Sequence, residues 1–289
     1  MAAVIKHKRR AKQSHSMIGN MFSILLLVLM GAFMALPLVL AVCNSLKPLE
    51  ELFVFPPRFF VRNPTTDNFH DIFVLMRQSW VPFSRYIFNT VLITAVGTAG
   101  HLIIASLCAY PLAKHKFPGK NFCFWLIVTA LMFSTHVTAI PNYLIMSKLG
   151  GLDHYAALIL PAIAKPMGLF LMKQFMEQIP DSLIEAAKID GAGELKIFRS
   201  IVMPSVKPAW LTLIIFCFQD LWNLQGSNYI YSENLKTLPY ALSQISAAGI
   251  SRAGATAAVA VIMMIVPITI FMLCQSNIIE TMVSSGIKE

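Results

Sequence analysis

Long apolar runs alternate with short polar segments along most of the 289 residues. A helix needs about 20 mainly apolar residues to cross the hydrocarbon layer of a membrane. Six stretches meet this need, near residues 18–43, 85–113, 121–146, 155–173, 207–226 and 254–276. Because a helix satisfies its own backbone hydrogen bonds in lipid, the pattern predicts an all-α, polytopic membrane helical bundle with about six transmembrane helices.

Composition supports a membrane protein and argues against an ordinary soluble domain. Apolar residues make up 56% of the chain, charged residues only 13%, and the mean hydropathy is +0.66. Soluble domains carry about a quarter charged residues. The formal net charge is +9, but the basic residues cluster between apolar runs, which indicates membrane topology and not a nucleic-acid partner.

The positions of the basic residues also predict the orientation. Lys114, Lys116 and Lys120 crowd one short connection, and short basic connections face the cytoplasm. With six spans, both termini are then cytoplasmic. The expected organisation is a basic cytoplasmic N-terminus (1–17), a transmembrane domain (18–276) and a cytoplasmic tail (277–289).

The first apolar run, from Met21 to Cys43, resembles a signal peptide because basic residues precede it. It is longer than the usual apolar region of such a peptide, and no small-x-small cleavage site follows it. We therefore interpret it as the first span. The long segment 44–84, rich in proline, is expected to fold over the outer face.

Few residues suggest chemistry of the chain's own. The five cysteines form no CxxC pair and are expected to be small buried hydrophobes. His101 and His136 are interpreted as structural, and the other histidines have no metal-ligand spacing. Pro118-Gly119-Lys120-Asn121 fails the pattern of a phosphate-binding loop. We expect no catalytic residue, no metal and no cofactor in this chain, so any ATP must be bound by a partner.

The predicted cytoplasmic segment 174–206 has the clearest local pattern. Ser182 and Glu185 have the spacing of a capping box, and Gly191 can close the short helix that follows. A second helical run is expected from Gly193 to just before Pro204. Leu183, Ile184 and Ala187 give the first helix an apolar stripe. Either a partner protein or the chain's own bundle must cover that stripe.

This segment resembles the EAA loop of ABC importer permeases. The matching residues are Glu185, Ala186, Ala187, Gly191, Ile201 and Pro204, with Met203 in place of the usual leucine. The resemblance implies that these residues, with Asp190, form a coupling helix that docks into a cleft on an ATP-binding subunit.

The resemblance extends along the chain to the carbohydrate branch of the family, in particular its maltose-type subunit with six spans. It is based on Phe117–Lys120, Ile140–Leu144, Ala157–Pro161, Trp222-Asn223, Thr237–Pro239 and the tail Ser285–Glu289, where Glu289 departs from the pattern. It implies a bacterial or archaeal plasma-membrane importer with a second permease subunit, two ATPase subunits and an external solute-binding protein, carrying a carbohydrate.

Polar residues within the predicted spans are candidates for the solute pathway. Lys165 lies in the fourth span, where an intramembrane charge marks either a pathway or a structural pair. Gln219, Asp220, Trp222 and Asn223 lie together in the fifth span and combine amide, carboxylate and aromatic groups that suit a sugar. Helix–helix hydrogen bonding is the alternative.

Two other classes of membrane protein have sequence features of their own. A secondary transporter needs coupling-ion sites and usually an inverted repeat. A membrane enzyme needs a catalytic motif such as HExxH or GxSxG. The sequence shows neither set of features.

Overall fold

The computed structural model describes residues 17–77, 80–226, 228–247, 249 and 252–286, and within these ranges the regular structure is helical. The helices are α1 (Met17–Ser45), α2 (Leu49–Leu52), α3 (Asp67–Arg77), α4 (Phe83–Lys114), α5 (Lys120–Leu131), α6 (Thr135–Lys148), α7 (Ala156–Ile163), α8 (Pro166–Glu177), α9 (Asp181–Ile189), α10 (Glu194–Ile197), the π-helical turn η1 (Phe198–Val202), α11 (Met203–Ser205), α12 (Lys207–Trp222), the 3₁₀ turn η2 (Glu233–Leu235), α13 (Leu238–Ser246) and α14 (Ala253–Gly286).

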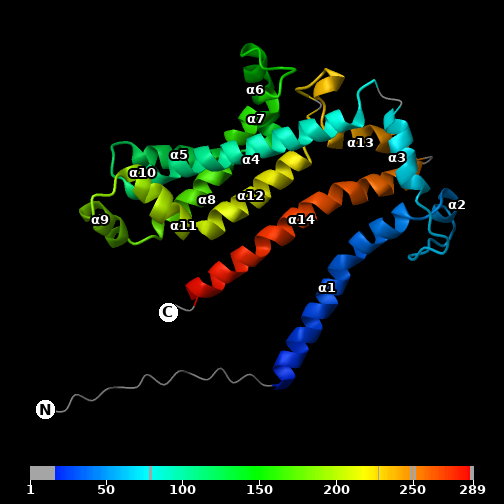
Figure 1. Cartoon of the computed structure of the whole chain (residues 1–289), viewed down its shortest axis with the longest axis horizontal. Helices are drawn as coiled ribbons and strands as arrows, with labels where there is room; N and C mark the ends of the chain where they lie inside the picture. The colour runs from blue at the N-terminus through cyan, green and yellow to red at the C-terminus, as the bar shows by residue number, and fades with distance from the viewer. Residues whose placement is uncertain (1–16, 78–79, 227, 248, 250–251, 287–289) are drawn as a thin grey trace.

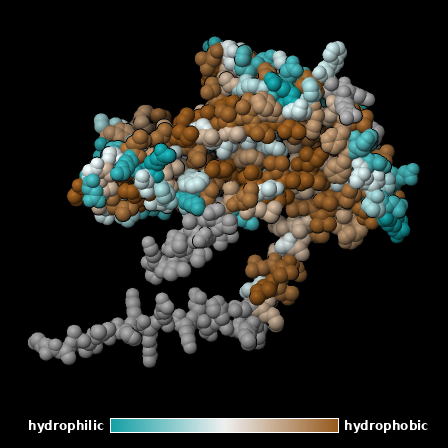
Figure 2. Space-filling view, in the orientation of Figure 1, coloured by the Kyte–Doolittle hydropathy of each residue, from teal (hydrophilic) through white to brown (hydrophobic). Residues whose placement is uncertain are grey.

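Helix α4 lies at the centre of the bundle and packs with several other helices. Helices α7, α8 and α12 pack along α4, α14 packs on α12, and α1 packs on α14 (Figure 1). Figure 2 shows a hydrophobic band across the middle of the molecule, with hydrophilic residues gathered at the α9–α10 end and at the α2–α3 end. This is the surface of a protein that spans a membrane, which confirms the predicted all-α membrane bundle.

Four helical segments are individually long and apolar enough to cross a membrane: Met21–Ser45, Phe83–Lys114, Ala156–Glu177 and Ala253–Gln275. The described residues contain up to six such segments if each of two bent helix pairs counts as one span. The third predicted span is one of these pairs: α5 and α6 meet at an angle of 110°. The prediction of a continuous helix over 121–146 is therefore wrong. Ser134 accepts a hydrogen bond from the amide of Val137 and starts α6 anew.

The other bent pair adjoins the fifth span. The helical run from Glu194 continues through η1 and Pro204 to Ser205 and then turns by 78° into α12. The expectation that this run ends before Pro204 is wrong, because α11 runs from Met203 through Pro204 to Ser205. The fifth span ends at Trp222, four residues earlier than expected.

The described residues of segment 44–84 fold over one end of the bundle, and that this end is the outer face stays a prediction. The amide nitrogen of Asn68 donates to the carbonyls of Ser45 (2.9 Å) and Lys47 (2.8 Å), and Glu51 accepts from the amide of Arg62 (2.9 Å). Ile72 and Met76 of α3 pack with α13 and α14 in one apolar cluster. These contacts hold the segment against the ends of the helices.

Some side-chain predictions need correction. Among the cysteines only Cys217 is buried, whereas Cys108 and Cys123 are exposed on the surface of the single chain. His136 is exposed on α6 and is not packed between helices. The predicted basic N-terminus up to residue 16 and the tail residues 287–289 lie outside the described residues.

Candidate functional site

The predicted coupling helix is α9, whose nine residues are too few to be stable alone. Ile184 and Ala187 are buried in a core cluster with residues of α4, α8 and α12. The chain itself therefore covers these two members of the stripe, and the idea that a partner covers the whole stripe is wrong. Leu183 remains 46% exposed.

Two further apolar residues at this end were missed from the sequence. Ile189 is 87% exposed and Leu195 is 73% exposed. The helical periodicity that predicted the stripe excludes Ile189, which lies five positions after Ile184, and Leu195 belongs to the next helix. Together with Leu183 they leave apolar surface available to another protein.

The start of α9 is fixed by an ion pair and not by the predicted capping box. The helix begins at Asp181, and its cap residue Pro180 supplies no side-chain hydrogen bond. Instead, Nζ of Lys114 lies 2.7 Å from the Asp181 carboxylate and also donates to the carbonyls of Ile179 and Glu177. The Lys114 side chain is only 6% exposed, so this contact binds α9 to the end of α4.

The hydrogen bond and the positive charge of Lys114 lower the pKa of Asp181. The aspartate is therefore ionised at neutral pH.

The end of α9 follows the prediction. Gly191 has φ +76°, its amide donates to the carbonyl of Lys188 (3.0 Å), and the amide of Ala192 donates to that of Ala187 (3.0 Å). These two bonds form a Schellman motif, in which the left-handed residue is usually glycine. The predicted role of Gly191 in closing the helix is confirmed.

Glu194 anchors this second end of α9. One carboxylate oxygen lies 2.6 Å from Nζ of Lys188, and the other accepts a hydrogen bond from the Tyr110 hydroxyl (2.8 Å) and lies 3.5 Å from Nε2 of His115. Tyr110 belongs to α4 and His115 follows it directly. Both ends of α9 are thus attached to the same end of α4.

The structure divides the motif residues into two groups. Ala187 is buried, and Ile201 packs against the same core cluster. Glu185, Ala186, Asp190, Gly191 and Pro204 are exposed. The first group holds the segment to the bundle, and the second is accessible to a partner.

The predicted pathway residues lie at a break between helices. Lys165 precedes α8, at the junction with α7, and its Nζ lies 2.7 Å from the Asp220 carboxylate of α12. The two side chains are 42% and 59% exposed, so the pair is open to its surroundings. Gln219 and Asn223 are also exposed, and the Asn223 amide donates to the carbonyl of Gln219.

Trp222 does not join this polar group. It is buried, and its Nε1 donates to the carbonyl of Met263 in α14 (3.1 Å). Its ring stacks on Phe218, and both residues line an apolar cavity of about 400 Å³ between α4, α12 and α14. The structure therefore separates Trp222 from Gln219, Asp220 and Asn223.

His101 is structural, as predicted. Its Nδ1 lies 2.9 Å from the carbonyl of Ile163, so it ties α4 to the end of α7. Among the described residues, no group of three His, Cys, Asp or Glu side chains could hold a metal ion.

Comparison with known proteins shows that the part of the chain that contains α9 and the Lys165–Asp220 pair matches a known family. Residues 101–283 match the family described as the binding-protein-dependent transport system inner membrane component. The chain belongs to this family. It is a multi-pass inner membrane permease, and the resemblance drawn from the EAA motif is confirmed.

Curated relatives agree with this assignment. The chain is 36% identical over 206 residues to Protein LplC of Bacillus subtilis, a match that covers 70% of this chain and 66% of that protein. It is 31% identical over 205 residues to the sn-glycerol-3-phosphate transport system permease protein UgpE of Escherichia coli K12, covering 71% of this chain and 73% of UgpE.

Solved structures share the fold. A chain of a bacterial ABC transporter involved in the import of the acidic polysaccharide alginate superposes with a TM-score of 0.74 at 22% identity, over 91% of this permease and 98% of that chain. The alginate transporter in complex with an alginate pentasaccharide-bound periplasmic protein matches with a TM-score of 0.57 at 15% identity, over 88% and 92%.

Proposed function

We propose that this permease carries a sugar or oligosaccharide, delivered by an external solute-binding protein, through an ATP-driven importer. The observation that carries the proposal is the anchored α9 segment. Its inner face is packed on the bundle, and its outer face presents Glu185 and Ala186 of the EAA motif together with Asp190. A short helix held in this way is suited to be pushed as a unit by another subunit.

The energy for transport comes from separate subunits in this proposal. Two ATPase subunits bind ATP and Mg²⁺ and hydrolyse the nucleotide, while this chain is non-catalytic and needs no cofactor of its own. Binding of ATP draws the ATPase subunits together, and α9 follows them. Leu183, Ile189 and Leu195 supply the apolar contact that such docking needs.

A second permease subunit completes the pathway in this proposal. The most apolar stretch of α1 has none of its described residues buried within this chain, and the main packing partner of α1 is α14. Lipid and a partner subunit would together cover this surface.

The Lys165–Asp220 pair supports a carbohydrate substrate. An ammonium group donates hydrogen bonds and a carboxylate accepts them, so the two side chains match the hydroxyl groups of a sugar. Alginate, for which the solved transporters are named, is a carbohydrate, and sn-glycerol-3-phosphate, for which UgpE is named, is a phosphate ester that also carries hydroxyl groups.

The test is reconstitution of the permease in proteoliposomes with its partner ATPase and permease subunits. Uptake of a labelled saccharide should require ATP in the vesicle lumen, on the side of the ATPase subunits. It should also require the loaded binding protein in the outside solution. The permease alone should be inert. Uptake by the permease alone, abolished by an ionophore, would instead identify a secondary transporter.

A further inference from the structure

The α4 helix is bonded at both of its ends to segments that lie outside the packed helices. At one end, Lys114 binds the start of α9 through Asp181, and Tyr110 binds the end of α9 through Glu194. Between these attachments Ile184 and Ala187 share a core cluster with Ala113. A rotation of α9 relative to α4 would break two charge-assisted contacts and expose this packing.

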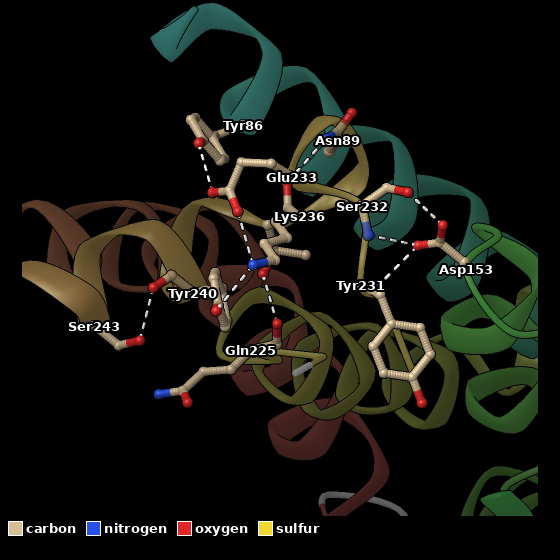
Figure 3. Close-up of polar contacts among 11 residues, drawn as sticks. Tyr86, Asn89, Asp153, Gln225, Tyr231, Ser232, Glu233, Lys236, Tyr240 and Ser243 are labelled. Atoms are coloured by element: carbon tan, nitrogen blue, oxygen red, sulfur yellow. Dashed lines mark hydrogen bonds and ion pairs between the residues drawn. The ribbon is translucent and has the colours of Figure 1, made fainter. Parts of the chain in front are cut away.

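The opposite end of α4 holds the segment that connects α12 to α13. The Tyr86 hydroxyl donates to Glu233 (2.8 Å), and the Asn89 amide donates to the carbonyls of Asn234 (2.9 Å) and Lys236 (2.8 Å). Tyr86 and Asn89 are almost completely buried, and Figure 3 shows both pointing from α4 towards the η2 turn.

Thr90, the residue after Asn89, adds a further hydrogen bond between α4 and this segment. The Thr90 hydroxyl accepts a hydrogen bond from the amide of Leu238 (2.7 Å), the first residue of α13. Glu233 and Lys236 are themselves paired at 2.7 Å, which closes the turn on itself. Segment 233–238 is thus fixed to α4 by main-chain and side-chain bonds.

Between its two ends α4 is one helix of 32 residues. At a rise of about 1.5 Å per residue this is about 48 Å, longer than the hydrocarbon layer of a membrane. Pro111 is its one internal proline and lies in the last turn, next to Tyr110. Helices α7, α8 and α12 support the remaining length.

We propose that α4 is a rigid strut that joins the coupling helix α9 to segment 233–238 on the opposite side of the membrane. Tyr110, Lys114 and Glu194 are the positioning residues that make α9 and α4 move as one body. This inference rests on the proposed function, because it describes how movement of the ATPase subunits reaches the far side of the permease.

The first test measures the strut directly in the assembled transporter. Spin labels are placed at Ser84 and Ser182, two exposed positions at the start of α4 and on α9, after the five native cysteines are replaced by serine. Pulsed electron paramagnetic resonance gives the distance between the labels without nucleotide and with ATP plus loaded binding protein. The proposal expects one narrow distribution, unchanged between the two states. A distance that shifts with ATP overturns it.

The second test releases the two attachments. Lys114→Met removes the ion pair at the start of α9, Tyr110→Phe removes the hydrogen bond from α4 to Glu194, and the double variant removes both. The ratio of ATPase activity with and without loaded binding protein should fall by about fivefold or more in the double variant. The Ser84–Ser182 distribution should broaden, while the subunits still co-purify.

Matched variants separate positioning from general loss of structure. Lys114→Arg keeps the positive charge and hydrogen-bond donors and should restore the ratio, and Lys116→Met removes an exposed charge from the same connection and should leave it unchanged. If the wild-type transporter shows neither stimulation nor uptake, the proposed function fails. If the wild type is stimulated and the double variant matches it, the strut alone is refuted.

Discussion

Lys165, at the junction of α7 and α8, forms an ion pair with Asp220 of α12. This pairing limits the ability of Lys165 to attract an anionic solute. Its Nζ lies 2.7 Å from Asp220, so the positive charge is already compensated. Lys165→Ala would leave the carboxylate without this partner. Since exposed pairs contribute up to about 1 kcal/mol, we expect saccharide uptake to fall by up to about fivefold while the complex still assembles.

The charge swap provides the control. Lys165→Asp combined with Asp220→Lys restores a pair of the same composition and should recover most of the uptake. Lys148→Ala removes an exposed lysine at the end of α6 and should have no effect. Uptake by Lys165→Ala that equals the wild-type rate would remove the pair from the pathway.

A close helix contact gives a second prediction for a single residue. A Cβ atom added to Gly168 would lie 2.1 Å from Nε2 of His101 and 2.9 Å from Cδ1 of Leu213. His101 is held by its bond to Ile163, so it cannot move without losing that bond. Gly168→Ala should therefore destabilise the protein by about 1–3 kcal/mol, the usual cost of overpacking.

Thermal unfolding in detergent measures this effect. Gly31→Ala in α1 is the matched control, because its added Cβ meets no atom within 4 Å in the described part of the chain. A Gly168→Ala variant with the melting temperature of Gly31→Ala would show that the α4–α8 contact can relax.

Sequence reasoning at this scale succeeded where a residue's role depends on its own backbone. Gly191 adopts the left-handed conformation that only glycine takes readily, so its place after an amphipathic run was sufficient. It failed where the role depends on a partner distant in sequence. Neither the pairing of Asp181 with Lys114 nor the bond from Trp222 to Met263 can be derived from local spacing.

At the scale of elements, the end of α9 depends on the left-handed backbone conformation of Gly191. Alanine substitutions at Gly191 and at the nearby Gly193 test this dependence. Gly191 has φ +76°, whereas Gly193 has φ −70°, and an added Cβ meets nothing within 4 Å at either position among the described residues. Gly191→Ala should cost about 1 kcal/mol through strain alone. Gly193→Ala carries no such strain.

Affinity for the ATPase subunit measures the difference. Gly191→Ala should weaken co-purification or titrated binding by about fivefold, the equivalent of about 1 kcal/mol. Gly193→Ala should bind like the wild type. Equal binding by both variants would show that α9 docks without its Schellman motif.

Asp153, in the loop between α6 and α7, is hydrogen-bonded to the connection between α12 and α13. This residue has φ +59° and accepts hydrogen bonds from the amides of Tyr231 (2.9 Å) and Ser232 (2.8 Å) and from the Ser232 hydroxyl (Figure 3). The bonds from Ser232 lower the pKa of Asp153. The ionised form is therefore favoured by folding, and its stabilising contribution is complete at neutral pH and lost as pH falls through the lowered pKa.

Asp153→Asn should loosen this tie at neutral pH without disturbing the backbone, because asparagine also tolerates positive φ. The neutral oxygen accepts more weakly than a carboxylate. Hydrogen exchange at the amides of Tyr231 and Ser232 should become faster, while exchange within α4 stays unchanged. Unaltered protection of both amides would contradict the assigned role of the carboxylate.

The bends of the helices were the least predictable elements. Hydropathy indicates that a stretch can enter a membrane but does not indicate its direction, so the 110° turn between α5 and α6 escaped the prediction of one span over 121–146. The π-helical turn before Pro204 was also missed, and Ile197 just before it and Val202 at its end are buried in the core.

At the scale of the whole molecule, hydropathy was sufficient to predict the bundle. The hydrophobic band of Figure 2 separates two hydrophilic ends, one formed by α9 and α10 and the other by α2 and α3. The connection 115–119 after α4 lies at the α9 end, and Trp80 lies before α4, at the opposite end. The sides of the membrane that these ends face depend on charge and not on shape.

Cysteine accessibility tests the predicted orientation. In a chain with its five native cysteines replaced, Lys116→Cys and Trp80→Cys each provide one thiol at an exposed position. Because short basic connections stay in the cytoplasm, a membrane-impermeant maleimide should label Trp80→Cys in intact spheroplasts and Lys116→Cys only in inverted vesicles. The opposite pattern would place α9 outside the cell, where no ATPase subunit could reach it, and the proposed mode of coupling would be excluded.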